Sequence, residues 1–127
     1  MARVWCAGAA GRSYTSAVRI LIAEDETIIR LDLRGLLEKA GYEVVGEARD
    51  GEEAVALAAE LEPDLAVMDV KMPRLDGIEA ARRILEARPI PVVMLTAFGQ
   101  PDLVARAVEV GVFGYLVKPF REQDVVP

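Results

Sequence analysis

From about residue 18 onward, short runs of consecutive apolar residues alternate with longer stretches in which apolar and polar residues are mixed. Consecutive apolar positions are typical of strands buried on both faces, as in a parallel sheet. The chain therefore predicts five buried strands, at Val18–Ala23, Val44–Val45, Leu65–Met68, Val92–Leu95 and Tyr115–Val117.

The longer stretches predict helices, because their apolar residues recur at three- and four-residue spacing. In residues 27–40 the predicted inward face comprises Ile29, Leu33, Leu36, Leu37 and Ala40. Asp50, with Glu53 three positions later, is typical of a capped helix start. Further helices are predicted after Asp76-Gly77 and over residues 101–110. Residues 120–127 are expected to begin a last helix that the chain end truncates.

The alternation of strands and helices predicts an α/β fold with a parallel sheet covered on both faces. Right-handed crossovers favour a flavodoxin-like, doubly wound sheet of five strands in the order 2-1-3-4-5. At 127 residues the chain fits one domain. We expect residues 1–17 to be a flexible N-terminal extension and residues 18–127 to form the domain.

Charge and composition narrow the possible functions. The net charge is −6 and the basic residues are scattered, so we expect no direct nucleic-acid contact by this segment. The adjacent Arg82 and Arg83 are typical of a solvated helix face. Cys6 is the single cysteine, which excludes an internal disulfide. No apolar run is long enough for a membrane span or a signal peptide. We therefore expect a cytoplasmic protein without membrane contact.

The chain has no histidine, which excludes Ser-His-Asp and Cys-His catalysis. Carboxylates, hydroxyls and lysines remain as candidate reactive groups. They fall at or just after the carboxyl ends of four predicted strands, as Glu24-Asp25, Asp69, Thr96 and Lys118. These ends share one edge of a parallel sheet, and ligands bind there, at the crevice between the first and third strands.

Three crowded carboxylates repel one another, and a hard divalent cation would relieve that repulsion. Mg²⁺ prefers one or two protein carboxylates, water and phosphate oxygens. A cation beside Asp69 indicates phosphoryl transfer to that carboxylate, a known form of nucleophilic catalysis. The Lys118 ammonium and the Thr96 hydroxyl are suited to hold the transferred phosphoryl group.

These residues make the chain resemble the receiver (CheY-like) family of response regulators. The resemblance rests on Glu24-Asp25, on Asp69 followed by Met72-Pro73 and Asp76-Gly77, on Thr96-Ala97, and on Tyr115 three residues before Lys118-Pro119. Each motif alone is weakly specific, but their order and their positions at strand ends are highly specific together.

The resemblance implies that a sensor histidine kinase phosphorylates Asp69 in a Mg²⁺-dependent reaction. Asp25, Asp69 and the backbone carbonyl of Lys71 would hold the ion, with Glu24 assisting through water. Thr96, Lys118 and the backbone N–H of Ala97 would hold the phosphoryl group. The Lys118-Pro119 bond is expected to be cis.

The same resemblance makes Thr96 and Tyr115 a switch pair, in which movement of Thr96 toward the phosphate lets Tyr115 turn inward. For Tyr115, ordinary core packing is the alternative. A phosphorylation-dependent homodimer is also implied. The domain would be a phosphoacceptor that assists its own phosphoryl transfer and dephosphorylation, rather than an enzyme acting on a separate substrate.

A narrower resemblance concerns the output. Residues 71–74, 95–100 and 115–120 are similar to receivers of AmiR/NasT-type antitermination regulators, in which an RNA-binding ANTAR domain follows. That domain is expected to be missing from these 127 residues.

Two rival functions stay open. One is a pseudo-receiver that binds proteins without being phosphorylated. The other is an aspartate-nucleophile phosphatase, although such enzymes generally need a second acid where this chain has Lys71. For Glu24-Asp25, simple capping of the first helix is the alternative.

Overall fold

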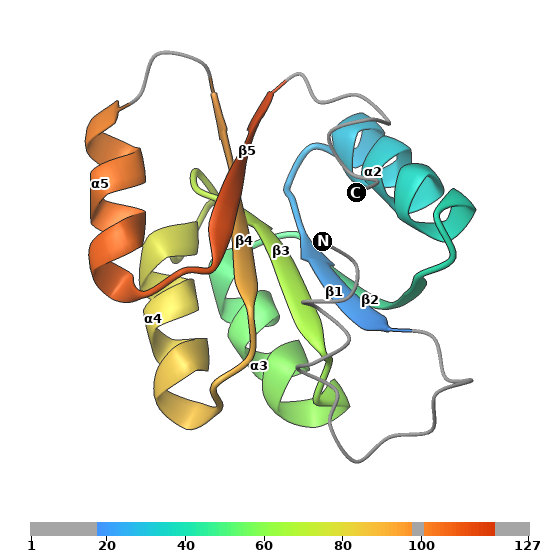
Figure 1. The fold of residues 1–127 in the computed structure, drawn as a ribbon, viewed down its shortest axis with the longest axis horizontal. Coiled ribbons are helices and arrows are strands. Elements are labelled where there is room, and N and C mark those ends of the chain that lie inside the picture. Colours follow the sequence, from blue (N-terminus) through green and yellow to red (C-terminus); the bar gives the residue numbers. More distant parts are fainter. Residues whose placement is uncertain (1–17, 98–100, 119–127) are drawn as a thin grey trace.

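The computed structural model describes residues 18–97 and 101–118, which form a single five-stranded parallel sheet with helices on both faces (Figure 1). The strand order is β2-β1-β3-β4-β5, as predicted. The strands are β1 (Arg19–Ala23), β2 (Glu43–Ala48), β3 (Leu65–Asp69), β4 (Val92–Ala97) and β5 (Gly114–Lys118). The helices are α2 (Thr27–Lys39), α3 (Gly51–Leu61), α4 (Gly77–Ala87) and α5 (Pro101–Val110). The flavodoxin-like fold is therefore confirmed.

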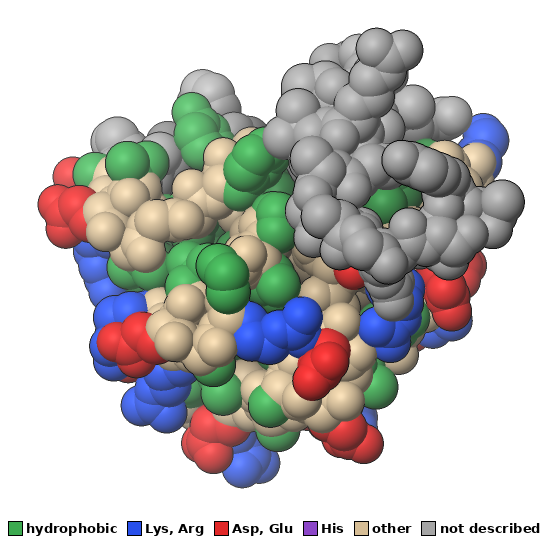
Figure 2. Space-filling model, turned by 60° about the horizontal axis from the view of Figure 1, so that its bottom comes forward, with side chains coloured by type: hydrophobic (Ala, Val, Ile, Leu, Met, Phe, Trp, Pro, Cys, Tyr) green, Lys and Arg blue, Asp and Glu red, His purple; other side chains and the backbone are tan. Residues whose placement is uncertain are grey.

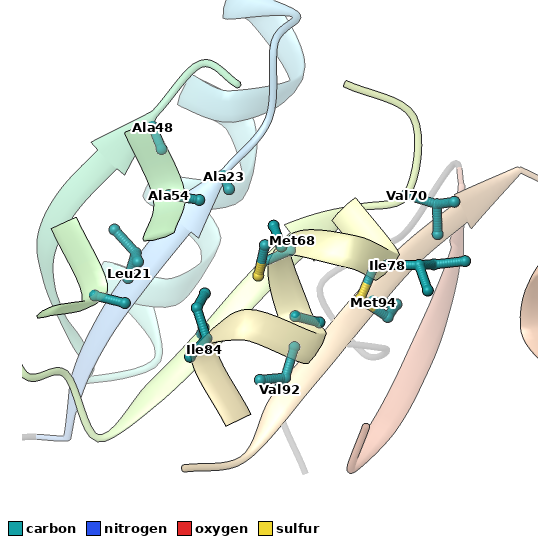
Figure 3. Close-up of a cluster of buried hydrophobic side chains, with 14 of the residues drawn as sticks. Leu21, Ala23, Ala48, Ala54, Met68, Val70, Ile78, Ile84, Val92 and Met94 are labelled. Atoms are coloured by element: carbon teal, nitrogen blue, oxygen red, sulfur yellow. The ribbon is translucent and has the colours of Figure 1, made fainter. Parts of the chain in front are cut away.

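The sheet separates two hydrophobic clusters, because side chains alternate between its faces. On one face, Leu21 of β1 and Met68 of β3 pack with apolar residues of α3, α4 and α5 (Figure 3). On the other face, Ile20 and Ile22 of β1 pack with Leu33 and Leu37 of α2. The central strands are buried from both sides, which explains their uninterrupted apolar sequences.

The two edge strands are longer than predicted. β2 extends from Glu43 to Ala48, whereas only Val44-Val45 was predicted. An edge strand exposes part of its surface to solvent, so it can contain polar residues. The apolar run in β2 is interrupted by Glu43, Gly46 and Glu47, and the apolar pattern therefore predicted too short a strand. β5 likewise gains one residue at each end of the predicted Tyr115–Val117.

The prediction of which residues of α2 face the sheet was only partly correct. Leu33 and Leu37 are buried, but Ile29, Leu36 and Ala40 are partly exposed. The third buried residue is Arg30. Residues 30, 33 and 37 are three and four positions apart, so they share one face of the helix, and this face packs against the sheet.

The helix ends carry local stop and start signals, and the predicted cap at Asp50 is confirmed. Asp50 caps α3, its carboxylate accepting from the Glu53 N–H at 2.8 Å, and Glu53 accepts in return from the Arg49 N–H at 2.7 Å. Asp76 caps α4 in the same way through the Glu79 N–H at 2.9 Å. Gly41 follows α2 with φ +98°, a conformation that favours glycine. The caps at Asp50 and Asp76 fix where α3 and α4 start relative to the preceding strands.

Basic side chains form no separate patch on the face drawn in Figure 2, where they are interspersed with acidic ones. On α4, Arg82 pairs with Glu79 and Glu86, and Arg83 pairs with Glu79. The prediction of a solvated arginine face is thus confirmed. Within the ranges that the structure describes, no helix is long and apolar enough to cross a membrane.

Candidate functional site

The carboxyl ends of the central strands bring the predicted reactive residues to one edge of the sheet. Ala23 of β1 pairs with Met68 of β3, so Glu24 follows its strand at the level of Asp69, the last residue of β3. Asp69 in turn pairs with Leu95 of β4, directly before Thr96. Residues separated by more than forty positions in the sequence therefore meet because their strands are in register.

Glu24, Asp25 and Asp69 form a compact acidic cluster, here called the acidic site. One carboxylate oxygen from each lies within 4.8 Å of the other two. Glu24 is fully buried at 0% exposure and Asp69 is buried, whereas Asp25 is exposed. The predicted convergence of these three acids is confirmed, and the full burial of Glu24 is more than helix capping alone would require.

The acidic site has the donors and the spacing that a hard cation needs. Mg²⁺ holds oxygen ligands at about 2.1 Å, so two ligands of one ion lie at most about 4.2 Å apart. The upper limit of 4.8 Å on the separations between the three carboxylate oxygens is slightly larger than this ligand–ligand distance. Separations within this limit leave room for one ion among the three carboxylates, bound directly or through water.

The main chain around Asp69 is closely packed. The Val70 N–H donates to the Leu95 carbonyl at 3.1 Å, and the Gly77 N–H donates to the Val70 carbonyl at 2.7 Å. A Cβ atom at Gly77 would overlap the Asp69 carbonyl oxygen, and at Gly51 it would overlap that of Leu75. The start of α4 therefore packs against the backbone of Asp69, and the start of α3 packs against the backbone of Leu75. Both contacts require glycine.

The remaining predicted residues occupy the neighbouring strands. Thr96 is buried near the end of β4. Ala97 and Lys118 are paired as the last residues of β4 and β5. Lys71 is exposed in the loop after β3.

Several predictions concern parts of the chain outside the described residues. They are those for residues 1–17 and 120–127, for the side chains of Ala97 and Lys118, and for the peptide bond to Pro119. Tyr115 pairs with Met94 in the sheet, yet its side chain is 50% exposed. The core-packing alternative for this tyrosine is therefore wrong.

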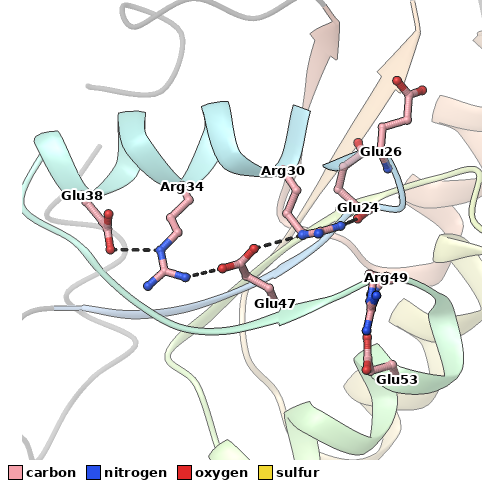
Figure 4. Close-up of polar contacts among 8 residues, drawn as sticks. All are labelled: Glu24, Glu26, Arg30, Arg34, Glu38, Glu47, Arg49 and Glu53. Carbon is pink, nitrogen blue, oxygen red and sulfur yellow. Dashed lines mark hydrogen bonds and ion pairs between the residues drawn. The ribbon is translucent and has the colours of Figure 1, made fainter. Parts of the chain in front are cut away.

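Sequence reasoning missed Arg30, which reaches the acidic site from α2. Its Nη1 donates to the backbone carbonyl of Glu24 at 2.8 Å, and its Nε donates to Glu47 Oε1 at 3.0 Å (Figure 4). A sequence signal existed, because Arg30 stands at helical spacing with Leu33 and Leu37. A charged residue at such a core-facing position needs a buried partner.

Together, fold and site define a class: a flavodoxin-like domain with a cation-suited acidic site where the strand order reverses. The comparison with known families is more specific. Residues 20–127 match the family described as "Response regulator receiver domain", and the chain belongs to this family.

Relatives agree with this assignment. The chain is 59% identical over 109 residues to the transcriptional regulatory protein PdtaR of Mycobacterium tuberculosis, covering 86% of this chain and 53% of PdtaR. It thus spans about half the length of that relative. It is 40% identical over 109 residues to the chemotaxis protein CheY of Thermotoga maritima, covering 85% of this chain and 91% of that protein.

Among solved structures, the Vibrio cholerae chemotaxis protein CheY4 superposes with a TM-score of 0.80 at 33% identity, covering 87% of this chain and 93% of CheY4.

Proposed function

We propose that this receiver domain is phosphorylated on Asp69 by a sensor histidine kinase, with Mg²⁺ bound in the acidic site. The observation that carries the proposal is the convergence of Glu24, Asp25 and Asp69 at the carboxyl edge of the sheet. Membership in the receiver family supports it, because the predicted roles rest on motifs of that family.

In the proposed reaction, a carboxylate oxygen of Asp69 forms a bond to phosphorus while the phosphorus–nitrogen bond of a phosphohistidine breaks. The electron pair of the broken bond stays on the imidazole nitrogen, which leaves as neutral histidine after taking up a proton from solvent. Asp25, Asp69 and the Lys71 carbonyl would hold Mg²⁺, with Glu24 contributing through water. The ion would neutralise negative charge on the phosphoryl oxygens.

The switch would use the neighbouring strands. Thr96 would donate its hydroxyl to one phosphoryl oxygen, the Ala97 N–H and the Lys118 ammonium would hold others, and Tyr115 would turn inward. The half-exposed Tyr115 supports this role, because it has an outward position to leave. Val108 and Phe113 are also exposed. This α5–β5 face would change on phosphorylation and could form a homodimer.

Beryllofluoride with Mg²⁺ tests the proposal, because it mimics an aspartyl phosphate. We expect NMR shift changes at the amides of Thr96 and Tyr115 in the wild type. Asp69→Asn should abolish them. Asp32→Asn is the matched control, since Asp32 is exposed on α2, and it should respond like the wild type.

An unchanged wild-type spectrum would contradict the proposal. Absence of an acyl phosphate after treatment with a small phosphodonor would favour the pseudo-receiver. Steady turnover of a phosphate ester would favour the phosphatase.

We also propose that the switch controls an output segment acting in transcription, by RNA-binding antitermination. Two observations support this: the similarity to PdtaR, a transcriptional regulatory protein about half of which this chain covers, and the resemblance to AmiR/NasT-type receivers. The coding sequence beyond Pro127 tests the proposal. An encoded helical RNA-binding domain would support it, and a DNA-binding or enzymatic domain would contradict it.

A further inference from the structure

Arg30 brings a buried positive charge from α2 to the turn that carries the acidic site. The residue is only 9% exposed. Its two contacts use different nitrogens of one rigid guanidinium: Nη1 holds the Glu24 carbonyl and Nε holds Glu47 on β2. Arginine suits this arrangement, because its planar group presents several donors in a fixed geometry.

The turn held by Arg30 is organised around Glu24. The Glu24 N–H donates to the Ala48 carbonyl at 3.0 Å, directly after Ala23, which is paired with Ala48 at the end of the β1–β2 ladder. The Glu24 carboxylate accepts from the Glu26 N–H at 3.1 Å. Arg30 supplies the bond to the remaining backbone group of Glu24, its carbonyl. Glu24 is thus held at its backbone N–H, its backbone carbonyl and its carboxylate, and Asp25 lies within this turn.

A row of alternating charges supports Arg30 from outside. Glu47 is shared between Arg30 and Arg34, and Arg34 also pairs with Glu38 at 3.2 Å (Figure 4). Arg34 is 40% exposed at its side chain, and its ion pairs are with Glu38 on the same helix and with Glu47 on β2, whereas Arg30 also bonds to the Glu24 carbonyl. Both arginines bond to Glu47, but only for Arg30 is a bond to the Glu24 carbonyl described. Arg34 is therefore a matched control for substitutions of Arg30.

We propose that Arg30 is a positioning residue of the acidic site. It holds the Glu24–Glu26 turn in the geometry in which the carboxylates of Glu24 and Asp25 meet that of Asp69. The metal-dependent part of this inference rests on the proposed function, whereas the effect on the turn does not. Two predictions follow: losing the two-nitrogen contact weakens cation binding, and it loosens the turn even without a cation.

The test compares Arg30→Met, Arg30→Lys and Arg34→Met in the full chain. The first readout is the Mg²⁺ dissociation constant from NMR titration. The second is hydrogen exchange of the Glu26 amide without metal, relative to the Val67 amide in β3. The relative rate separates local opening of the turn from global unfolding. Lysine keeps the charge and a long apolar stem, so Arg30→Lys gives the same test if Arg30→Met does not fold.

We expect Arg30→Met to weaken Mg²⁺ binding about tenfold, equivalent to about 1.4 kcal/mol, and to raise the relative exchange rate of Glu26 by a similar factor. Arg30→Lys should be impaired in both readouts, because a single ammonium cannot reproduce the forked contact. Arg34→Met should change each by less than about twofold, as for an exposed ion pair.

Three outcomes would overturn the inference: an unchanged Glu26 exchange in Arg30→Met, equal effects of the Arg30 and Arg34 substitutions, or full recovery in Arg30→Lys. The last would show that net charge, rather than geometry, matters. A wild type that does not bind Mg²⁺ would refute the proposed function instead. The exchange of Glu26 would still decide whether Arg30 positions the turn.

Discussion

Replacing Gly77 by alanine should destabilise the domain strongly, although alanine is the better helix former. A Cβ atom at this position would overlap the carbonyl oxygen of Asp69, with the carbonyl carbon at 2.8 Å and Met94 Cε at 3.1 Å. The obstructing atoms of Asp69 are backbone atoms of a central strand. They cannot rotate away as a flexible side chain would, so either the start of α4 or the end of β3 must move.

The expected magnitude follows from the nature of this overlap. Inserting atoms into a packed interior typically costs about 1–3 kcal/mol, and a clash between backbones belongs at the upper end. Gly35 provides the control, because it lies within α2 and an added Cβ would meet nothing within 4 Å. Gly35→Ala should stabilise the domain by about 0.5–1 kcal/mol through helix propensity. The two variants should therefore differ by about 3–4 kcal/mol.

Urea unfolding followed by circular dichroism measures both variants. For a domain of this size, the midpoint of Gly77→Ala should fall by about 1–2 M relative to the wild type. Gly77→Ala should also weaken Mg²⁺ binding, because the displaced main chain carries Asp69. If Gly77→Ala were as stable as the wild type while Gly35→Ala behaved as expected, the close approach of α4 to β3 would be refuted.

Three further predictions concern the charged residues. Asp25→Asn should raise metal-free stability by up to about 1 kcal/mol by relieving repulsion, and should reduce the rise in melting temperature that Mg²⁺ causes; a metal-free loss of stability would contradict the crowding of acids. Asp50→Ala should cost about 1 kcal/mol in urea unfolding, because it removes the cap of α3; an unchanged midpoint would contradict that role. The hydrogen bond from Arg82 lowers the pKa of Glu79 from 4.5 to about 2. The small stabilisation by Glu79 should therefore be complete above pH 4.5 and disappear as the pH falls to about 2. Melting curves of Glu79→Gln against the wild type should converge over this range, and a constant difference would contradict the pairing.

The order of elements and the sheet topology could be predicted because the central strands are apolar on both faces. Such strands have one interpretation, a parallel sheet covered by helices. The edge strand β2 was underestimated, since Glu43 and Glu47 reach solvent or ion pairs and break the apolar run. The inward face of α2 was misread for a related reason: Arg30 is buried, and hydrophobic periodicity does not count a charged residue as core.

The acidic site was predictable from position alone, because the carboxyl ends of parallel strands share an edge. Glu24, Asp25 and Asp69 therefore had to lie close together once the strand order was known. The contacts of Arg30 were not predictable, since they depend on how α2 is rotated against β1 and β2. The steric need for glycine at positions 51 and 77 also depends on distances between elements. Sequence patterns within one element do not contain that information.

The main chain that follows Asp69 has little freedom to shift, because it is bonded to β4 on one side and closed by Gly77 on the other. If negative charge were added to the Asp69 side chain, the backbone of β3 would therefore move little. The adjustment would have to occur in neighbours that retain freedom, such as the half-exposed Tyr115. We would therefore expect a structural response to such a charge at the surface beside β5 rather than in the central strand.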